Sequence, residues 1–500
     1  MSPRQPILLV DVNAYLPPAE YKLDWNHGQK LHRESDIYTE DEIRFQERVF
    51  ERSGLHPERT YLPPSLNPRF VGVQPKTGLV EAATEAQLVL CGALEGLLAK
   101  TGLAPADIDI LVTTCSIYCP TPSLASMLIN HFKMRPGIQS YHLGGMGCAN
   151  GVVGVNLVRD LLQARPNSNA VFLTTEVTTP AFYPGHDKHR LVTNLLFRMG
   201  GAAMLMSNKS AAWAGRAKYQ LAFNHRVHIG SSDEAYTAIH YGPDDKGING
   251  VYLGKNVVTE ASRALTKVMW AVGPHVLTPR QKAEFAANWV RRKLLGAQSV
   301  APYQPRFNGA VSHFLLHAGG AKVLDGLGKA LQLDEHDLEP SRAVLRDYGN
   351  VSSSTTWYTL SYVETVRGVK KGDKVMQVGV GSGIKCGVNV WKALRDVKDV
   401  HEVWETYVPP EQAAAARAAR ARPVLHVDGA HAGRHLAMRA LFMVLMLALL
   451  LALHTLLALE GGQWEAKAAG LAHTLWGGAQ GWLTSPAAAQ QLPGATVQEL

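Results

Sequence analysis

Helix-like and strand-like segments alternate twice along this chain of 500 residues, and this repetition restricts the fold more than any other feature. Each half opens with an amphipathic helical pattern, at 81–102 and at 258–277, and continues with short apolar runs typical of buried strands. These runs lie at 108–115 and 170–176 in the first half and at 311–320, 374–381 and 384–391 in the second, where helices are also expected at 321–333 and 349–368. Such alternation buries both faces of a sheet, so we predict an α/β fold with duplicated layers.

Shifts in composition divide the chain further. Residues 1–65 carry two Pro-Pro pairs between charged helical stretches, and we expect them to wrap around the body as an N-terminal segment. The Ala- and Arg-rich run after residue 410 is typical of a linker. The expected parts are therefore an N-terminal segment (1–65), a first half (66–215), a second half (216–408), a linker (409–439), a transmembrane helix (440–459) and a tail (460–500).

The transmembrane helix is expected at Ala440–Leu459, where only His454 and Thr455 interrupt an apolar run. A helix of this length, at about 1.5 Å per residue, crosses a bilayer core of about 30 Å. A buried helix of a soluble core is the alternative, but such a helix is rarely so uniformly rich in Leu, Met and Ala. Arginines precede the run and Glu460 and Glu465 follow it, so the positive-inside rule predicts that the large N-terminal part faces the cytosol.

Cysteine usage and charge set wider limits on function. The five cysteines (Cys91, Cys115, Cys119, Cys148 and Cys386) show no pair spacing suited to a metal site or a disulfide framework, so we expect reduced thiols in the cytosol. No other cluster with metal-ligand spacing stands out, and no metal is expected. The net charge of +8 suits nucleic acid, an anionic membrane or a polyanionic substrate such as coenzyme A. Charge alone does not choose among these partners.

One cysteine lies where an apolar run turns into a helical pattern. The stretch reads SYHLGGMGCANGVVGVNLVRDLLQ, with Gly144, Gly145 and Gly147 in the turn before Cys148. The apolar spacing that follows predicts a helix whose first turn includes the cysteine. Free N–H groups and the helix dipole at such a position favour the thiolate and lower the pKa of the thiol. Cys148 is thus a candidate nucleophile and the turn a candidate oxyanion site, although a cysteine in a turn is often only a small buried residue.

Two other polar groups occupy comparable positions in the second half. His313 and His317 flank the run SHFLLHAGG, and Asn350 opens the expected helix in YGNVSSSTTWY. Neutral imidazole and carboxamide N–H groups stabilise an oxyanion. Each residue alone is commonly structural, as a satisfied histidine or a helix N-cap. Cysteine, histidine and asparagine at successive strand ends form a more specific combination.

Five segments resemble plant-type 3-ketoacyl-CoA synthases, the condensing enzymes of very-long-chain fatty acid elongation. The segments are DIDILVTTCSIYCPTPSLASMLINHFKMR, SYHLGGMGCANG, NLLFRMGGAAMLMSN, HFLLHAGGAKVLDGL and YGNVSSSTTWYTLSYVE, and the similarity extends from about Ile7 to about Val403. The resemblance implies a thiolase-like fold with α-β-α-β-α layers. It also implies a catalytic site formed by Cys148 in GMGC, His317 in HAGG and Asn350 in YGN.

The reaction that this resemblance implies is a decarboxylative Claisen condensation. Cys148 takes a long acyl group from acyl-CoA, malonyl-CoA loses CO2, and the resulting enolate, held by His317 and Asn350, attacks the acyl-cysteine. The product is a 3-oxoacyl-CoA two carbons longer. A thiolate attacks thioesters well, and neutral donors stabilise an enolate without protonating its carbon early. Acyl-CoA and malonyl-CoA are the expected substrates, and no cofactor is expected because decarboxylation replaces a strong base.

Four further residues are compared with the family pattern. His313 matches a family histidine, as does His228 in NHRVHIG, and both are expected either to orient the site or to serve the structure. Phe197 in LLFRMGG is a weak candidate for the border of an acyl channel, with a plain core role as the alternative. Arg346 stands four residues before the asparagine, where the family commonly has histidine, so it puts a local hydrogen bond in doubt. The N-terminal membrane helices usual in the family are not found in this sequence, and we expect 440–459 to replace them.

Two other motifs receive structural interpretations. GVGSGIKCG at 379–387 resembles a nucleotide-binding loop, but a strand rather than a helix follows it, so we expect a tight turn that lines the acyl site. Arg280, Arg291, Arg292 and Lys293 are expected on a solvated helix face, with contact to coenzyme A phosphate as the alternative. No nucleic-acid partner is expected.

Two rival functions stay open from the sequence. A type III polyketide synthase shares the fold and the Cys, His and Asn residues but repeats malonyl additions and cyclises the product. An inactive membrane-tethered scaffold is the non-enzyme alternative. By family analogy we expect a homodimer at the endoplasmic reticulum membrane with the catalytic part in the cytosol, and partners such as a ketoacyl-CoA reductase, a dehydratase and an enoyl-CoA reductase.

Overall fold

A computed structural model describes residues 5–294, 296, 299–301 and 303–407. Residues Met1–Val408 form one compact unit, so the two halves expected on either side of residue 215 share a single body. The linker, transmembrane helix and tail expected at 409–439, 440–459 and 460–500 lie outside the described residues.

One mixed sheet of nine strands runs through both halves of the described body, in the order β3-β2-β4-β5-β1-β6-β11-β10-β9. The pairs β2–β3, β2–β4 and β9–β10 are parallel, and the strands at the centre are antiparallel. The strands are β1 Leu8–Ala14, β2 Ile110–Thr114, β3 Gln139–Leu143, β4 Asn169–Thr175, β5 Gly201–Ser207, β6 Tyr219–His228, β9 His313–Leu316, β10 Lys374–Gly381 and β11 Lys385–Ala393; β7 Ile239–Pro243 and β8 Asn249–Leu253 form a separate hairpin.

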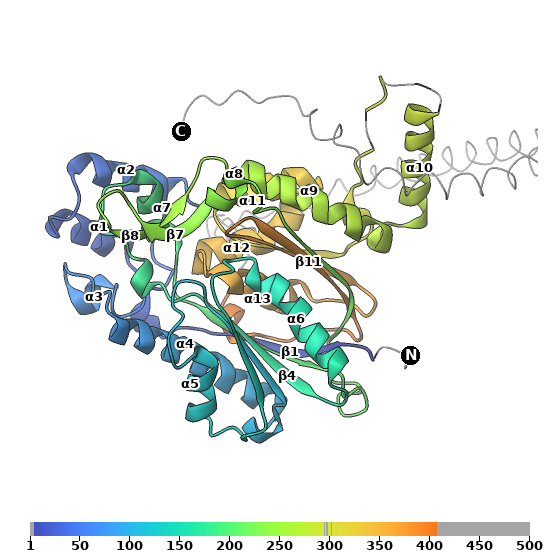
Figure 1. Cartoon of the computed structure of the whole chain (residues 1–500), viewed down its shortest axis with the longest axis horizontal. Coiled ribbons are helices and arrows are strands. Elements are labelled where there is room, and N and C mark those ends of the chain that lie inside the picture. Colours follow the sequence, from blue (N-terminus) through green and yellow to red (C-terminus); the bar gives the residue numbers. More distant parts are fainter. Residues whose placement is uncertain (1–4, 295, 297–298, 302, 408–500) are drawn as a thin grey trace, which may run out of the picture. The chain divides into compact units, whose positions relative to one another are not determined.

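Helices cover both faces of this sheet, and two of them form a central layer. The central helices α6 and α13 lie between the two halves of the sheet, with α4 and α5 outside the first half and α9, α11 and α12 outside the second (Figure 1). The helices are α1 Trp25–Glu34, α2 Glu40–Glu51, α3 Pro68–Val71, α4 Leu79–Thr101, α5 Leu124–His131, α6 Asn150–Ala164, α7 Lys188–Leu196, α8 Asp233–Thr237, α9 Val257–Val276, α10 Pro279–Lys293, α11 Ala321–Leu331, α12 Glu335–Tyr348 and α13 Thr355–Tyr362. The predicted α-β-α-β-α layering is confirmed.

Short helical turns join these elements at several points. The 3-10 turns are η1 Ala19–Tyr21, η2 Pro105–Asp107, η3 Thr179–Ala181, η4 Phe307–Gly309, η5 Ser352–Ser354 and η7 Glu402–Trp404, and a π-helical turn, η6 Val363–Arg367, extends α13. The expected strands and helices of both halves are all present within a few residues. The helix α12, which begins with the Asp334 side chain capping the N–H of Asp337, lies in a stretch for which no element is expected.

The N-terminal segment differs from its prediction. Residues 8–14 do not wrap around the body but form β1, a fully central strand between β5 and β6. Both faces of β1 meet core residues, so Leu9 and Val12 are completely buried. A strand buried on both faces loses the apolar–polar alternation that marks a strand in sequence, which is why the short run before Asp11 is uninformative.

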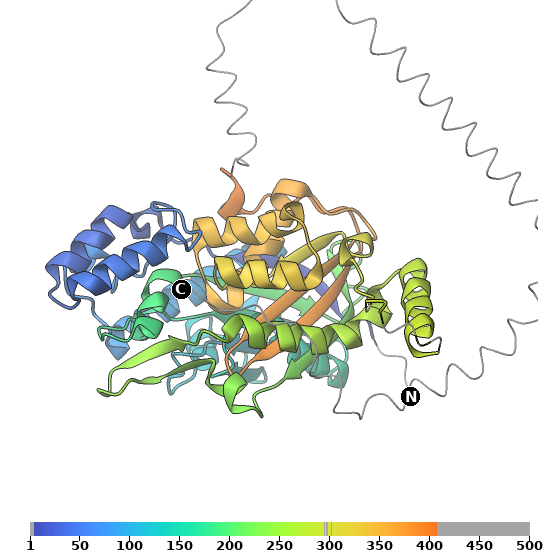
Figure 2. The same cartoon turned by 90° about the horizontal axis from the view of Figure 1, so that it is seen from above.

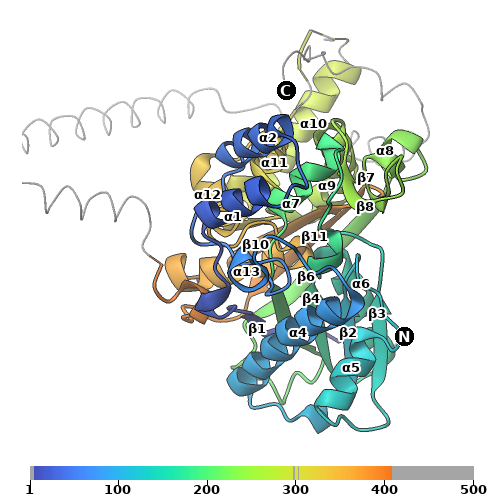
Figure 3. The same ribbon diagram turned by 90° about the vertical axis from the view of Figure 1, so that its left-hand side faces the viewer.

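The rest of the N-terminal segment does cover the body from outside. In α2, Thr39 and Glu42 form a capping box, and Trp25 of α1 stacks on Phe50 of α2 with ring centroids 3.7 Å apart. Figure 3 shows α1 and α2 beside α7. In Figure 2 these helices, in blue, and α10, in yellow-green, lie on opposite sides of the described body. No residue of α10 is buried, in agreement with the expected solvated face for its basic residues.

Within the described residues, one helix has the length and apolar composition needed to cross a membrane, namely α4, Leu79–Thr101. Half of its most apolar window is buried within the protein, and the helix packs against β1, β4 and β5. This packing accounts for its apolar composition through burial against the sheet.

Candidate active site

Cys148 lies in the turn between β3 and α6. Gly145 and Gly147 adopt positive φ angles of 63° and 68°, which glycine tolerates without strain, and they turn the chain sharply before the cysteine. The helix α6 begins at Asn150, so Cys148 precedes it and does not lie in its first turn as predicted. The cysteine residue as a whole is of intermediate exposure at the end of the turn.

The turn between β10 and β11 packs directly on the cysteine turn. A Cβ atom at Gly381 would lie 2.4 Å from the backbone nitrogen of Ala149 and 2.9 Å from that of Cys148, so only glycine fits without a backbone shift. The motif at 379–387 is therefore the expected tight turn beside the site, and β11 follows it instead of the helix that a dinucleotide loop requires.

A second turn, at residues 350–355, brings the other predicted residues to the cysteine. The Ser352 hydroxyl lies 3.3 Å from Cys148 Sγ and donates a hydrogen bond to it. The Ser352 backbone N–H donates to Asn350 Oδ1 at 2.9 Å, and Asn350 Nδ2 donates to the Gly319 carbonyl at 3.2 Å. Asn350 is thus two hydrogen bonds away from the cysteine sulfur and is held in a fixed orientation.

The same turn also holds His317, which follows β9. His317 Nδ1 lies 2.7 Å from Thr355 Oγ1, and that hydroxyl lies 3.0 Å from the Ser352 carbonyl. Burial lowers the pKa of His317 to about 4, so the imidazole is neutral at physiological pH. Cys148, His317 and Asn350, which are far apart in sequence, therefore share one turn as their common support.

The ionisation of Cys148 differs from the prediction. Burial of the thiol, together with the nearby charge of Glu176, raises its pKa to about 12, although the hydrogen bond from Ser352 acts in the opposite direction. The expected lowering by a helix N-terminus is wrong, because the sulfur lies two residues before α6 in a desolvated position. In these surroundings the neutral thiol is favoured over the thiolate.

A buried carboxylate, Glu176, lies beside the cysteine and was not predicted. Its Oε1 accepts the backbone N–H groups of Ser116 and Ile117, both at 2.8 Å, and the Cys115 thiol at 3.2 Å. Its Oε2 lies 3.0 Å from the Ser352 hydroxyl, which is the same hydroxyl that contacts Cys148. Burial raises the pKa of Glu176, and the two backbone N–H groups act against that shift.

The two supporting histidines lie apart from this cluster. His313 is at the opposite end of β9 from His317, and its Nε2 is 3.4 Å from Asp373 Oδ2. His228 ends β6 in an exposed position beside Gly383 and Lys385. Neither histidine is in contact with Cys148 among the described contacts, so the structural interpretation fits both better than an orienting role.

Phe197 lies between the cysteine and a neighbouring cavity. Its side chain packs in the small cluster that includes Cys148, and its backbone forms a parallel bridge with Asn350. It also lines a small, partly open and largely apolar cavity. The cavity is enclosed by the N-terminal segment on one side and α7 on the other, with Leu23, Trp25, Leu62, Leu66, Ala181, Leu195 and Phe197 among its walls. Phe197 is thus a buried core residue that also borders this cavity, and both interpretations stay open.

Comparison with known proteins identifies the family of this site. The family model described as FAE1/Type III polyketide synthase-like protein matches residues 1–294, and the C-terminal domain of chalcone and stilbene synthases matches residues 304–394. 3-Ketoacyl-CoA synthase 5 of Arabidopsis thaliana is 41% identical over 399 residues, which cover 80% of both chains. 3-Ketoacyl-CoA synthase 2 of the same plant is 42% identical over 393 residues, covering 78% of this chain and 73% of the relative. The chain belongs to the 3-ketoacyl-CoA synthase family.

Solved structures add support for the fold. The 1,3,6,8-tetrahydroxynaphthalene synthase of Streptomyces coelicolor A3(2), a bacterial type III polyketide synthase, superimposes with a TM-score of 0.60 at 21% identity, covering 77% of this chain and 99% of that one. A type III pentaketide synthase from Neurospora crassa gives a TM-score of 0.60 at 19% identity and the same coverage. Both likenesses establish the thiolase-like fold of this 3-ketoacyl-CoA synthase family member.

Arg346, which stands where the family commonly has histidine, lies outside the site of this family member. The guanidinium donates to both oxygens of Asp347, at 2.8 and 3.0 Å, and its carbon lies 5.4 Å from the centroid of the Tyr407 ring. These contacts tie α12 to the end of the described chain. Arg346 therefore replaces the usual histidine without entering the group around Cys148.

Sequence reasoning missed Glu176, Ser352 and Thr355 in this family member. A usable signal for Glu176 was present, because the segment AVFLTTE places a carboxylate at the end of a fully buried strand, where an ionisable group needs a partner. Ser352 and Thr355 gave no comparable signal, since hydroxyl residues after an asparagine are typical of ordinary helix starts. Only the folded turn shows that their side chains contact the cysteine and the histidine.

Proposed function

We propose that this chain condenses malonyl-CoA with a long-chain acyl-CoA to give a 3-oxoacyl-CoA two carbons longer, together with CO2 and coenzyme A. The enzyme is an acyltransferase of very-long-chain fatty acid synthesis. The observation that carries this proposal is the turn at 350–355, which holds Asn350, contacts Cys148 through Ser352 and contacts His317 through Thr355.

Cys148 is the acyl carrier in this proposal. Its sulfur attacks the thioester carbon of acyl-CoA, the bond to the coenzyme A sulfur breaks, and an acyl-cysteine remains. Cys148 is of intermediate exposure, whereas the other side of its turn is closed by Gly381.

His317 and Asn350 stabilise the enolate formed when malonyl-CoA loses CO2. One amide hydrogen of Asn350 is directed to the Gly319 carbonyl, which leaves the second for the enolate oxygen. Because the Thr355 hydroxyl donates to the Ser352 carbonyl, its oxygen accepts from His317 Nδ1–H, and Nε2 of the neutral ring serves as the second donor once it has taken up a proton. The departing CO2 supplies the electron pair of the enolate, so the reaction uses no further cofactor.

A long apolar chain needs an apolar cavity beside the cysteine. The cavity behind Phe197 has that character, and we assign the acyl chain to it because Phe197 adjoins both the cavity and the cluster around Cys148. The N-terminal helices form one wall, so the segment that covers the body also shapes the substrate site.

Between the two enzymatic alternatives, sequence similarity favours elongation. The curated relatives near 40% identity are named 3-ketoacyl-CoA synthases, whereas the type III polyketide synthases with a similar fold are 18 to 21% identical. The scaffold alternative is disfavoured because the cysteine, histidine and asparagine are all present and connected, and Arg346 does not disturb them.

Assembly and location complete the proposal. The edge strand β3 leaves Tyr141 exposed and has a partner on one side only, as suits pairing with a second copy in a homodimer. The apolar run at 440–459 supports an anchor in the endoplasmic reticulum membrane, with the catalytic unit in the cytosol beside a ketoacyl-CoA reductase, a dehydratase and an enoyl-CoA reductase.

The direct test uses the full chain in detergent with malonyl-CoA and acyl-CoAs of graded length. Release of CO2 and a product longer by one two-carbon unit are expected, with an acyl adduct on the Cys148 peptide by mass spectrometry. A cyclised product with several extensions would support the polyketide alternative, and the absence of both adduct and turnover would support the scaffold.

A further inference from the structure

The helix α10, Pro279–Lys293, stands out from the rest of the described body. None of its residues is buried, and Figures 1 and 2 show it projecting beyond the end of α9. Most helices in proteins are stabilised by packing an apolar face against the body. Because α10 packs so little on its own protein, most of its surface is free to meet another partner.

One side of α10 is turned toward the protein. Gln281 Nε2 donates to the Arg306 carbonyl at 2.6 Å, and the Phe285 ring lies edge-on to the Tyr303 ring with centroids 6.3 Å apart. One turn further on, Asn288 Oδ1 accepts the Tyr303 backbone N–H at 3.1 Å. Positions 281, 285 and 288 form one line along a helix, so the opposite side of α10 faces away from the protein.

The outward side of α10 carries a short apolar line between two rows of cations. Ala283, Ala287, Val290 and Leu294 recur at the helical spacing of three and four residues, on the side opposite Phe285. Leu294, at the end of the helix, is 60% exposed. The cations that flank this line are Lys282 and Lys293 on one side and Arg280 and Arg291 on the other.

The charge of α10 is strongly one-sided. The helix contains five Lys and Arg residues and one acidic residue, Glu284, which pairs with Arg280 at 2.9 Å. Each Lys or Arg close to an anionic bilayer strengthens binding about fivefold. A helix with cations beside an apolar line lies in the interface of such a bilayer, with the cation stems along the apolar line and the charges at the headgroups.

We propose that α10 binds the surface of an anionic phospholipid bilayer, with Leu294 and the apolar line in the interface and the flanking cations at the lipid phosphates. This inference rests on the proposed membrane location, to which it adds a second contact. The segment 408–439 separates the described body from the apolar run at 440–459, so an anchor there would hold the body close to the bilayer.

Two other partners fit α10 less well. A single-stranded nucleic acid binds cations together with exposed aromatic rings on which bases stack, but the Phe285 ring is on the side turned toward the protein. A second copy of the chain would bring the same positive helix against α10, and like charges repel. Figure 3 also shows α10 well away from β3, the edge strand proposed to pair in a homodimer.

The test follows amide hydrogen exchange of α10 by mass spectrometry in the full chain, reconstituted in nanodiscs of phosphatidylcholine alone or mixed with phosphatidylserine. We expect peptides from 279–294 to exchange at least about fivefold more slowly in the anionic discs. The difference should disappear near 0.5 M NaCl, where the screening length falls to about 4 Å. Equal exchange of α10 in the two kinds of disc would overturn the inference.

A charge-reversal variant and a matched control identify the surface responsible. Lys282→Glu combined with Arg291→Glu should abolish the difference between the discs, while peptides of α6 exchange as in the parent chain and report that the fold is intact. Lys322→Glu combined with Lys329→Glu, at exposed positions of α11, gives the same change in net charge and should keep the difference. Equal losses in both variants would show an effect of net charge alone and would refute a site on α10.

Gel filtration of the same samples separates this inference from the proposed anchor. A chain that leaves phosphatidylcholine discs would refute an anchor at 440–459, whereas slower exchange of α10 on anionic discs would still support lipid binding by this helix. A chain retained on both discs with equal α10 exchange would keep the anchor and refute the helix site. Protection of α10 by a single-stranded oligonucleotide and not by lipid would assign the helix to nucleic acid and overturn the inference.

Discussion

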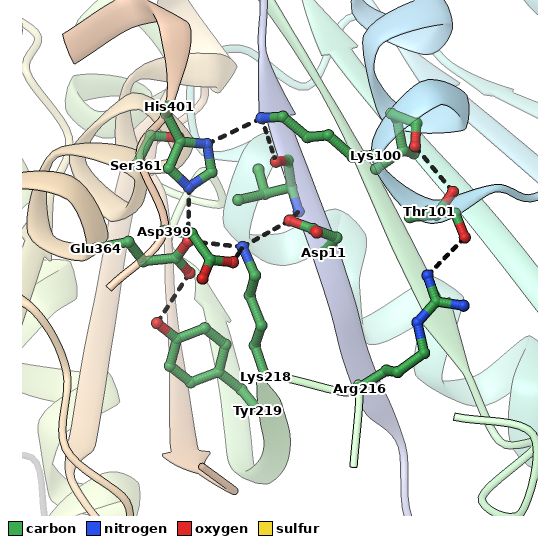
Figure 4. Close-up of polar contacts among 12 residues, drawn as sticks. Asp11, Lys100, Thr101, Arg216, Lys218, Tyr219, Ser361, Glu364, Asp399 and His401 are labelled. Atoms are coloured by element: carbon green, nitrogen blue, oxygen red, sulfur yellow. Dashed lines mark hydrogen bonds and ion pairs between the residues drawn. The ribbon is translucent and has the colours of Figure 1, made fainter. Parts of the chain in front are cut away.

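Two clusters of polar side chains in this protein are buried away from water, and they offset the free-energy cost of that burial in opposite ways. In the first, Lys218 is surrounded by carboxylates of Asp11, Glu364 and Asp399 at 2.6, 2.8 and 2.8 Å (Figure 4). Around it, His401 and Tyr219 also contact Glu364. In the second, the cluster around Cys148, the thiol and the imidazole are neutral, and Glu176 has only hydrogen-bond donors for partners.

The pKa shifts of the groups in the two clusters differ in the same way. In the Lys218 cluster, the neighbouring carboxylates raise the pKa of the lysine and the lysine lowers the pKa of Glu364, so both charged forms are stabilised in spite of burial. In the Cys148 cluster, burial dominates and favours the uncharged forms of Cys148 and His317. Paired charges, as in the Lys218 cluster, stabilise one arrangement of the fold. Buried groups without a charged partner, as in the Cys148 cluster, remain available to interact with the charge that develops on a substrate.

The largest effect is expected for Cys148→Ala, which should remove condensation to the assay background, a loss of at least about 10⁴-fold typical of a missing nucleophile. The acyl adduct should disappear, while the melting temperature changes little. Product formation and intact mass check this, with Cys119→Ala as the control thiol. Unchanged turnover in Cys148→Ala would break the comparison, since the second cluster would then have no chemical role.

Next in size is Lys218→Met, which removes the cation shared by three carboxylates. Removal of one partner of a buried ion pair costs about 3–5 kcal/mol of folding free energy. Urea unfolding measures this, and the activity per folded molecule should stay within threefold of the parent. Lys209→Met, which removes a partly exposed pair with Asp109 at 3.1 Å, is the control and should cost less than about 1 kcal/mol. If the Lys218→Met chain kept its stability but lost activity, the Lys218 cluster would serve catalysis and not the stability of the fold.

Asn350→Ala should reduce malonyl-CoA decarboxylation by about 100-fold, because one enolate donor contributes about 3 kcal/mol. Its effect on alkylation of Cys148 should be small, so the two half-reactions separate. Asn156→Ala, which removes a buried amide that donates to the Val153 carbonyl within α6, tests for a general effect of amide loss. Equal loss in both half-reactions would indicate that Asn350 serves only to shape the turn.

The pH dependence of malonyl-CoA decarboxylation tests whether His317 is neutral during the reaction. Because the pKa of His317 is about 4, the ring stays neutral above about pH 5, and it becomes a charged imidazolium with both nitrogens protonated only as the pH falls through 4. We therefore expect the rate to vary less than twofold between pH 6 and 8. A step near pH 6.5 would show a histidine of ordinary pKa in the substrate complex. Release of CO2 from labelled malonyl-CoA gives the measurement.

The smallest effect is expected for Arg346→His, the exchange that restores the common family residue. Arg346 contacts Asp347 and Tyr407 and not the cysteine cluster, so kcat/KM should change less than twofold. The folding free energy should change by less than about 1 kcal/mol, as is usual for a partly exposed ion pair. A large gain in activity would place position 346 within the site.

The sequence predicts the parts of this protein whose pattern is local. Helices such as α4 and α9 follow from the apolar period, and strands such as β2 and β10 follow from short apolar runs. The motifs around Cys148, His317 and Asn350 point to the catalytic residues through family resemblance. Prediction of the site's electrostatics failed for a physical reason. The position of Cys148 before a helix suggests an acidic thiol, but the pKa depends on the groups that bury it, and Glu176 and Ser352 come from distant segments. The central position of β1 was missed for the same reason, because its burial is created by β5 and β6.

The placement of β1 also constrains how the polypeptide matures on the ribosome. Leu8 is synthesised about two hundred residues before its sheet partners, Ser207 and Gln220. About two hundred residues must emerge before this strand finds either neighbour, and contacts of such sequence separation form late. The β1 segment therefore stays without its sheet partners until β5 and β6 have left the exit tunnel, and the centre of the sheet closes only then.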